Sequence, residues 1–351
     1  SICKTCGRNN STVKRGESGL SLVVGIDKPC GMSSHDVVSR CRRIFGEKRV
    51  GHAGTLDPQA SGVLIVCVGP ATRLDKYLVG HDKTYLVDVA FGAATETDDR
   101  EGAVIEQADV PAAVFDREFA ASYVKTLSGK IMQVPPLYSA LKKNGKKACD
   151  EARKGNAVEL EPRAVEIYDV DFIDLLAPDE TCPYTRWRLE VSVSKGTYIR
   201  SFARDLGRSL GTVAHVAELR RTRSGCLSVG DCVSLETLEQ LSTKSALDPL
   251  PLLGYRFAYV DDAAHARLAN GNALKAAQVG LMEEPCDATQ HQGDCCFPTY
   301  HESASSPTDG EYISVVYENK LAAIYRYSSS EAKWKADCVF NPSVMRKGRD
   351  L

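Results

Sequence analysis

The stretch GHAGTLDPQASGVLIVCVG, residues 51–69, holds the side chain that is best placed to do chemistry. Asp57 stands between small residues and a proline, directly before an apolar run. Gly51 and Gly54 permit backbone angles and close approaches that other residues hinder. Pro58 restricts Asp57 to extended geometry and excludes a helix there. A carboxylate on such a rigid loop could act as a covalent nucleophile, but an Asx-turn that merely caps the loop fits equally well.

A helix and a buried strand are expected on either side of this loop. GVLIVCVG (62–69) is a short, continuous, β-branched apolar run, which predicts a buried strand. Before the loop, Ser33 or Ser34 can cap a helix that ends at Gly46. The apolar face of that helix comprises Val37, Val38, Cys41, Ile44 and Phe45.

A second strand and helix are predicted in RLEVSVSKGTYIRSFARDLGRSLG, residues 188–211. Apolar residues alternate over 189–193, as in a half-buried strand, and then recur at helical spacing. Arg200, Arg204 and Arg208 form an i, i+4, i+8 row on another face of the expected helix. This unit places several cations close to one another.

Length and composition indicate a soluble, two-domain protein. The chain has 351 residues, of which 43% are hydrophobic and 26% charged. No apolar run reaches the ~20 residues of a membrane span. The 13 cysteines are scattered, which favours a reducing, intracellular compartment, cytoplasmic or organellar, over a disulfide framework. Cys3 and Cys6 have the spacing of half a zinc site, but no matching pair follows, so no metal is expected.

Two basic clusters suggest a nucleic-acid partner, although the net charge is only −2. Residues 195–223 contain seven basic residues and two acids. The second cluster, LKKNGKK, contributes Lys142, Lys143, Lys146 and Lys147. Such clusters are typical of phosphate-backbone contacts, while a solvated helix face would explain a single one. Pro135 and Pro136 exclude a core element near the lysines, which predicts an excursion toward a partner.

The C-terminal part is expected to form a small β domain, residues 254–351. YISVVYENKLAAIYRY has strand–turn–strand character around Glu318 and Asn319. A polar stretch at about 284–310, rich in Cys, Ser, Pro and His, predicts a flexible insertion in this domain.

Five long motifs resemble, in order, the TruB family of pseudouridine synthases. They are KPCGMSSHDVV, GHAGTLDPQASGVLIVCVGPATR, DKTYLVDVAFG, QVPPLYSALKKNGKKACDEARKG and SVSKGTYIRSFARDLGRSLGTVAHVAELRRTRSG. The resemblance implies an α+β fold with a mixed, largely antiparallel central sheet flanked by helices, and a small PUA-like β domain. The implied parts are a flexible segment at 1–20, a catalytic domain at 21–253 with an RNA-gripping excursion at about 130–160, and the PUA-like domain at 254–351.

The resemblance also implies an activity, the isomerisation of the T-loop uridine at position 55 of tRNA to pseudouridine. The reaction consumes no electron or group donor, so it implies no cofactor. Asp57 matches the family's catalytic aspartate. It could attack the sugar carbon, attack C6 of the base or take a sugar proton, and the sequence leaves the three routes open. The uridine must first be flipped out of the folded T-loop. The implied partner is the tRNA T-arm, bound by a monomer without an obligatory protein partner or a membrane.

Other site residues follow from the resemblance. Tyr85 in DKTY corresponds to the tyrosine that stacks on the target base, and Arg200 in GTYIR to the arginine that pairs with the catalytic carboxylate. Such a partner would keep Asp57 ionised and fixed. Tyr198 is implied at the wall of the uridine pocket. Further implied RNA-binding residues are His52 near the extruded nucleotide, Leu219 as the apolar pocket residue, Lys28 without a firm role, and the four lysines of LKKNGKK.

Two other functions compete with a stand-alone tRNA enzyme. One is the guide-RNA-dependent relative that modifies ribosomal RNA, and the lysine-rich excursion argues against it because a stand-alone enzyme must grip the T-arm itself. The other is a non-catalytic tRNA-binding or tRNA-folding module. The presence of Asp57, Tyr85 and Arg200 argues against that module. A glycosidase is disfavoured because no motif places a second carboxylate as its acid partner.

Overall fold

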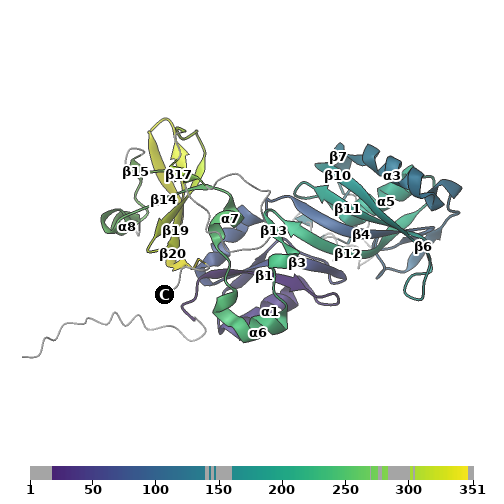
Figure 1. Ribbon diagram of the computed structural model, residues 1–351, viewed down its shortest axis with the longest axis horizontal. Helices are drawn as coiled ribbons and strands as arrows, with labels where there is room; N and C mark the ends of the chain where they lie inside the picture. The colour runs from purple at the N-terminus through teal and green to yellow at the C-terminus, as the bar shows by residue number, and fades with distance from the viewer. Residues whose placement is uncertain are drawn as a thin grey trace, which may run out of the picture.

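The computed structural model describes residues 18–138, 142–143, 146–147, 160–268, 270–275, 279–283, 301–302 and 305–346 (Figure 1). Cys3, Cys6 and most of the predicted N-terminal segment lie outside the described residues, as does most of the insertion predicted at 284–310. Among the described residues, no helix is both long and apolar enough to cross a membrane.

The larger of the two main sheets has nine strands. Its main path, in spatial order, is β1 (Leu22–Lys28), β3 (Ala60–Val68), β12 (Ala214–Ser224), β4 (Lys83–Phe91), β11 (Arg186–Val193), β10 (Arg163–Leu176) and β7 (Gly129–Gln133). The short strands β2 (Val50–Ala53) and β13 (Leu227–Ser228) pair with β3 and β12. All these pairs are antiparallel except β12 and β3, which are parallel. The mixed, largely antiparallel sheet that the resemblance implied is thus confirmed.

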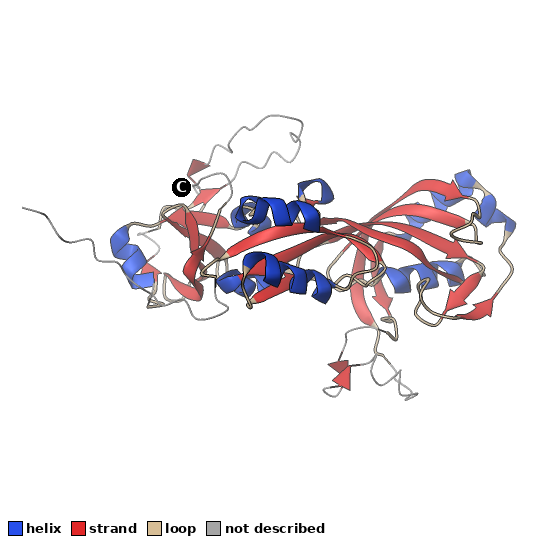
Figure 2. Cartoon of the chain, turned by 90° about the horizontal axis from the view of Figure 1, so that it is seen from below, coloured by secondary structure: helices blue, strands red, loops and turns tan. Residues whose placement is uncertain are grey.

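Helices lie against this sheet and also join its strands (Figure 2). The α-helices of the described residues are α1 (Ser34–Phe45), α2 (Asp75–Leu78), α3 (Arg117–Val124), α5 (Ile199–Ser209), α6 (Leu235–Leu241), α7 (Pro249–Leu253) and α8 (Asp262–Leu268). The 3-10 helices are η1 (Gly69–Leu74), η2 (Ala112–Phe115), η3 (Lys125–Leu127), η4 (Val229–Asp231) and η5 (Ser242–Ser245).

Helix α1 confirms the helix predicted from its caps. The Ser33 hydroxyl accepts a hydrogen bond from the Asp36 N–H, and the Asp36 carboxylate accepts one from the Ser33 N–H. This reciprocal arrangement satisfies two backbone donors at the helix start. Gly46 ends the helix in the left-handed conformation, with φ of 60°, where glycine carries no Cβ penalty. Val37, Cys41 and the other predicted apolar residues face the core, with Ile44 only partly buried.

The core between the large sheet and helices α1, α3 and α5 is built from apolar residues at alternate positions of the central strands. Val87, Val89 and Phe91 of β4 are all buried, and Trp187 of β11 packs edge-on against Phe91. The Trp187 indole also donates a hydrogen bond to the Val114 carbonyl. Alternation with period two therefore directs every second side chain of β4 toward the helices.

A second sheet of seven strands forms the C-terminal part. Its order is β15 (Leu274–Lys275), β20 (Lys333–Val344), β19 (Lys320–Ser328), β18 (Tyr312–Tyr317), β14 (Arg256–Tyr259), β16 (Met282–Glu283) and β17 (His301–Glu302). Glu318 and Asn319 form the predicted turn between β18 and β19, and both have positive φ. The small C-terminal β domain that the sequence predicted is thus present.

The two sheets are not just joined by a linker, because they also share an apolar core. One cluster of buried side chains joins Val63, Leu74 and Tyr77 to Ile324 and Phe340. At its edge the Asp337 carboxylate accepts hydrogen bonds from the Lys76 and Tyr77 side chains. The C-terminal sheet is therefore packed directly against η1 and α2.

The lysine-rich excursion begins later than predicted. Strand β7 extends to Gln133 and pairs with β10 at the edge of the large sheet, so residues 130–133 belong to the body of the protein. Beyond it, β8 (Lys142–Lys143) and β9 (Lys146–Lys147) form a separate two-stranded ribbon. The side chains of these four lysines are outside what the structure describes. A further ribbon consists of β5 (Ala93–Thr95) and β6 (Val104–Gln107).

Candidate active site

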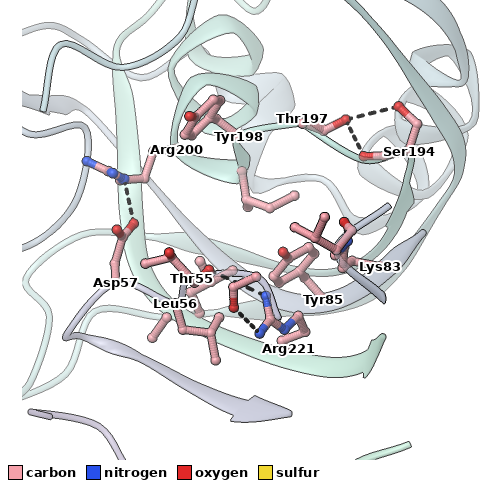
Figure 3. A pocket seen from close by; sticks show the side chains of 16 residues that line it. Thr55, Leu56, Asp57, Lys83, Tyr85, Ser194, Thr197, Tyr198, Arg200 and Arg221 are labelled. Carbon is pink, nitrogen blue, oxygen red and sulfur yellow. Dashed lines mark hydrogen bonds and ion pairs between the residues drawn. The ribbon is translucent and has the colours of Figure 1, made fainter. Parts of the chain in front are cut away.

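A cavity of about 300 Å³ opens where the Asp57 loop meets the start of α5 (Figure 3). It brings together five of the residues that the sequence singled out, namely Asp57, Tyr85, Tyr198, Arg200 and Leu219. These residues come from the loop before β3, from β4, from the segment that enters α5 and from β12. Elements far apart in the sequence thus converge on one concave site.

Asp57 and Arg200 form an ion pair, with 2.9 Å between Arg200 Nε and Asp57 Oδ2. The Arg200 side chain is only 7% exposed, and its other nitrogens donate to the backbone carbonyls of Thr97 and Tyr138, each at 3.0 Å. Asp99 lies 3.8 Å from Arg200 Nη1. Two separate segments, the turn at 97–99 and Tyr138, therefore hold the guanidinium, which in turn fixes the Asp57 carboxylate.

Burial raises the pKa of Asp57 above its ordinary value. Arg200 lowers this pKa, but the negative charges of Asp99 and Glu101 act in the same direction as burial, and the net change is a rise. Arg200 thus favours the ionised form of Asp57 against opposing effects that are larger in sum, and its role in keeping Asp57 ionised stays a prediction. The result is a carboxylate that is more basic than usual, as suits a nucleophile or a proton acceptor.

Arg221 anchors the start of the Asp57 loop from inside the protein. Its side chain is buried, with 1% of the residue exposed. Its guanidinium donates to the carbonyls of Val63 at 2.7 Å, Gly54 at 3.0 Å and Thr55 at 3.5 Å. Strand β3 and the loop that precedes Asp57 are therefore tied to β12 through one side chain.

Lys28 anchors the other end of the same loop and does not fit its predicted role in RNA binding. The residue has no exposed surface. Its ammonium donates to the carbonyls of Met32 at 2.6 Å, Pro29 at 2.9 Å and Pro58 at 3.2 Å. An amine enclosed by three carbonyls cannot reach an RNA phosphate without unfolding its surroundings, so we correct this prediction to a structural role.

The walls of the cavity suit a flat, partly apolar ligand. Tyr85 is 8% exposed and lies on β4 between Val191 of β11 and Arg221 of β12. Leu219 and Tyr198 line the cavity as well. Aromatic and aliphatic side chains of this kind can stack against a base that has left its helix.

His52 is not among the residues that line the cavity. It lies on β2, opposite Val66 of β3, and its Nδ1 is buried without a hydrogen-bond partner in the described part of the chain. Burial and the nearby Arg221 charge lower the pKa of His52. The predicted contact of His52 with the extruded nucleotide therefore stays a prediction.

Lys83 is a cavity residue that the sequence reasoning missed. Its ammonium donates to the carbonyls of Val79, at 2.8 Å, and His81. Burial, together with the charges of Arg221 and Lys195, lowers the pKa of Lys83 to about 8. The signal was available, because Lys83 precedes Tyr85 by two positions on the same strand, and such residues share a face.

The basic cluster at 195–223 is not the continuous surface stripe that the sequence suggested. Arg200 and Arg221 are buried, and Arg204 pairs with Asp98 at 3.1 Å. Arg220 pairs with Asp27 at 2.8 Å. The exposed cations of the cluster are Lys195, Arg208 and Arg223. Most of these charges therefore hold the site together and do not face a polyanion.

A metal site is not indicated by the residues present. Within the described ranges, no group of three or more His, Cys, Asp or Glu side chains is placed to hold a metal ion. The Asp57 carboxylate pairs instead with the Arg200 guanidinium.

Comparison with family models and solved structures shows the class of protein to which this chain is similar. The model for the TruB family pseudouridylate synthase N-terminal domain matches residues 42–199, and that for the tRNA pseudouridylate synthase B C-terminal domain matches residues 200–252. Two chains from solved structures, one of a Cbf5-Nop10-Gar1 complex and one of an H/ACA RNP bound to a substrate RNA, align with TM-scores of 0.61. Their identities are 24% and 22%, and they cover 92% of this chain and 84% and 86% of theirs. These two likenesses concern the fold.

Curated relatives then place the chain within a family. The tRNA pseudouridine synthase B of Listeria welshimeri is 35% identical over 327 residues, which is 91% of this chain and 98% of that protein. The protein of the same name from Pelotomaculum thermopropionicum is 45% identical over 229 residues, 65% of this chain and 71% of that protein. The chain belongs to the TruB family of pseudouridine synthases, and the resemblance found in its motifs is confirmed.

Proposed function

We propose that this protein is a stand-alone tRNA pseudouridine synthase that isomerises the T-loop uridine at position 55. The proposal rests on one observation. Asp57, which is ion-paired with Arg200, lines a cavity whose walls include Tyr85, Tyr198 and Leu219. The names of its relatives, tRNA pseudouridine synthase B, support the choice of RNA.

The chemistry required is an isomerisation that balances without a co-reactant. The bond from C1′ to N1 of the uridine breaks, the base rotates, and a bond from C1′ to C5 forms, while C5 loses a proton and N1 gains one. Asp57 would act as the nucleophile at C1′ or C6, or as the base that takes a sugar proton. Tyr85 would stack on the base, and Arg200 would hold Asp57 in place.

The RNA partner would be the T-arm of tRNA, bound by a monomer without an obligatory protein or guide RNA. The β8–β9 ribbon, with four lysines on its two short strands, supports this arrangement because it gives the chain its own cationic arm. Solved proteins of similar fold occur in complexes with Nop10 and Gar1. For this chain, the sequence identity to tRNA enzymes favours the stand-alone function.

The function is tested with an unmodified tRNA transcript. With a chelator present and no guide RNA, we expect about one pseudouridine per tRNA, at position 55. A transcript with cytidine at that position is the control and should yield none. The proposal fails if the folded protein forms no pseudouridine, or forms it only when a guide RNA is supplied.

The four lysines of the β8–β9 ribbon should contribute to affinity through phosphate contacts. Replacing Lys142, Lys143, Lys146 and Lys147 with alanine should weaken tRNA binding and make it less sensitive to salt. Each lost contact lowers the slope of log affinity against log salt by up to ~1. A filter-binding titration at several salt concentrations measures both quantities.

A matched control removes lysines outside both basic clusters. Lys48 and Lys244 are exposed and lie after α1 and in η5. Their replacement with alanine should leave the salt slope unchanged. If the ribbon variant shows the wild-type affinity and slope, the ribbon does not hold RNA.

A further inference from the structure

Gln133, the last residue of β7, is joined by its side chain to the residue that starts α5. The side chain is buried, with only 1% of the residue exposed. Its Nε2 donates to the carbonyl of Tyr198 at 3.1 Å, and its Oε1 accepts from the N–H of Tyr198 at 2.9 Å. One carboxamide thus satisfies both backbone groups of a single residue, as a neighbouring strand would.

Helix α5 depends on this support because its own N-terminus lacks a side-chain cap. Tyr198 is the N-cap residue, with φ of −101° and ψ of 116°, and its side chain makes no capping hydrogen bond. Tyrosine is not a favoured N-cap residue. Gln133 therefore holds the backbone two residues before Arg200, at the point where the chain turns into the helix.

The five residues after Gln133 continue the connection to α5. The Val134 carbonyl accepts from Ser201 Oγ at 2.8 Å and from Arg204 at 2.9 Å, and Ser201 has no exposed surface. The Tyr138 carbonyl accepts from Arg200 Nη2 at 3.0 Å. Residues 133–138 thus form a brace, and the first two turns of α5 are fastened to it by side chains.

We propose that Gln133 is a positioning residue for the isomerisation: it fixes the start of α5 so that the Arg200 guanidinium meets the Asp57 carboxylate. The proposal rests on the proposed function and deepens the description of that site. Gln133 acts through Tyr198 and Arg200 and is not among the residues that line the cavity.

The contacts of Arg200 make the site sensitive to small displacements of the start of α5. Arg200 reaches Asp57 with one nitrogen at 2.9 Å, while its two other nitrogens are held by Thr97 and Tyr138. A helix start that moves by about 1 Å would lengthen several of these contacts at once. Displacements of this size can cost about 100-fold in rate even when the substituted residue lies outside the site.

Only a carboxamide of this length can both donate to the Tyr198 carbonyl and accept from its N–H. Gln133→Met keeps the length but makes neither hydrogen bond. Gln133→Asn keeps the carboxamide but is one methylene too short to reach both groups, and it is the second variant if the first folds poorly. Asp116→Ala is the matched control: Asp116 accepts from the N–H groups of Glu118 and Phe119 at the start of α3, away from the cavity.

We expect Gln133→Met to lower kcat for an unmodified tRNA transcript by about 10- to 100-fold, with KM changed by no more than about twofold. Weaker pairing with Arg200 should raise the pKa of Asp57 further, because Arg200 is what lowers it. The acidic limb of the kcat profile should therefore move to higher pH. Asp116→Ala should lower the melting temperature while kcat and the acidic limb stay at their wild-type values.

A second measurement needs no substrate. The ¹³C signal of the Asp57 carboxyl, assigned by its absence from Asp57→Asn, should titrate at higher pH in Gln133→Met than in the wild type. If wild-type protein makes no pseudouridine, the proposed function fails, and this titration still tests the positioning role. That role is overturned if both Gln133 variants fold and show the wild-type kcat and Asp57 titration, or if Asp116→Ala shifts them equally.

Discussion

Replacing Asp57 with asparagine should abolish pseudouridine formation while the affinity for tRNA stays within about twofold of wild type. The amide has nearly the size and polarity of the carboxylate but neither its charge nor its nucleophilicity. We expect turnover to fall by at least ~1,000-fold, or about 4 kcal/mol of transition-state stabilisation. Affinity should persist because contacts with phosphates supply most of it. Pseudouridine mapping and a binding titration on the same sample measure the two effects.

The Asp57→Asn variant should also fold. Arg200 would keep its hydrogen bonds to the Thr97 and Tyr138 carbonyls and would still face Asp99. No buried charge would be left without partners, so a large loss of stability is not expected. The matched control is Asp109→Asn, since Asp109 is exposed, and it should turn over normally. Appreciable turnover by the Asp57 variant would remove Asp57 from the mechanism.

Replacing Arg221 with methionine should both destabilise the protein and slow the reaction. The variant loses the donors to the Gly54, Thr55 and Val63 carbonyls. A buried group left without its hydrogen bond costs about 1–3 kcal/mol, so we expect the free energy of unfolding to fall by about 2–4 kcal/mol. The loop before Asp57 would also lose its anchor to β12, and kcat should drop by about 100-fold.

Urea unfolding and single-turnover assays below the transition separate the two effects of this change. Arg117→Met is the control, because Arg117 pairs with Asp174 on the surface and both side chains are largely exposed. Surface ion pairs contribute little, so its urea midpoint and turnover should match those of wild type. If Arg221→Met matches them as well, Arg221 does not hold the loop.

The elements that carry the site could be predicted because their signals are local. The capping residues of α1, Ser33 and Gly46, lie within the helix ends they define. The apolar run of β3 and the strand and helix around Gly196 follow from short-range periodicity. The motifs then led to five residues that the fold places around one cavity, although their chemical roles stay predictions.

The spacing of charged residues along the sequence could not predict which of them are exposed and which are paired or buried. Arg204 belongs to a regular basic row, yet its partner Asp98 lies more than a hundred residues away in the sequence. Whether a cation faces solvent or a distant carboxylate is decided by tertiary contacts. The same holds for Lys28, whose partners are backbone carbonyls. Every residue has a backbone carbonyl, so the sequence does not show which ones will bind a lysine.

Gln133 and Asp99 were missed for a related reason. Gln133 ends an edge strand, and its role depends on the backbone of Tyr198, which the fold brings to it from 65 positions away. Asp99 lies 3.8 Å from Arg200 Nη1, on the turn after β5. Both residues act on groups that are distant in the sequence. The periodicity of apolar residues gives information only about positions a few residues apart.

The core shared by the two sheets has a consequence for how the protein is made in the cell. Val63 and Leu74 pack against Phe340 and Val344, so this core cannot close until the ribosome has released β20. At roughly 5–20 residues per second, β3 waits tens of seconds for those partners. During that time this face of β3 is open to chaperones and to other nascent chains, so aggregation can begin there before synthesis ends.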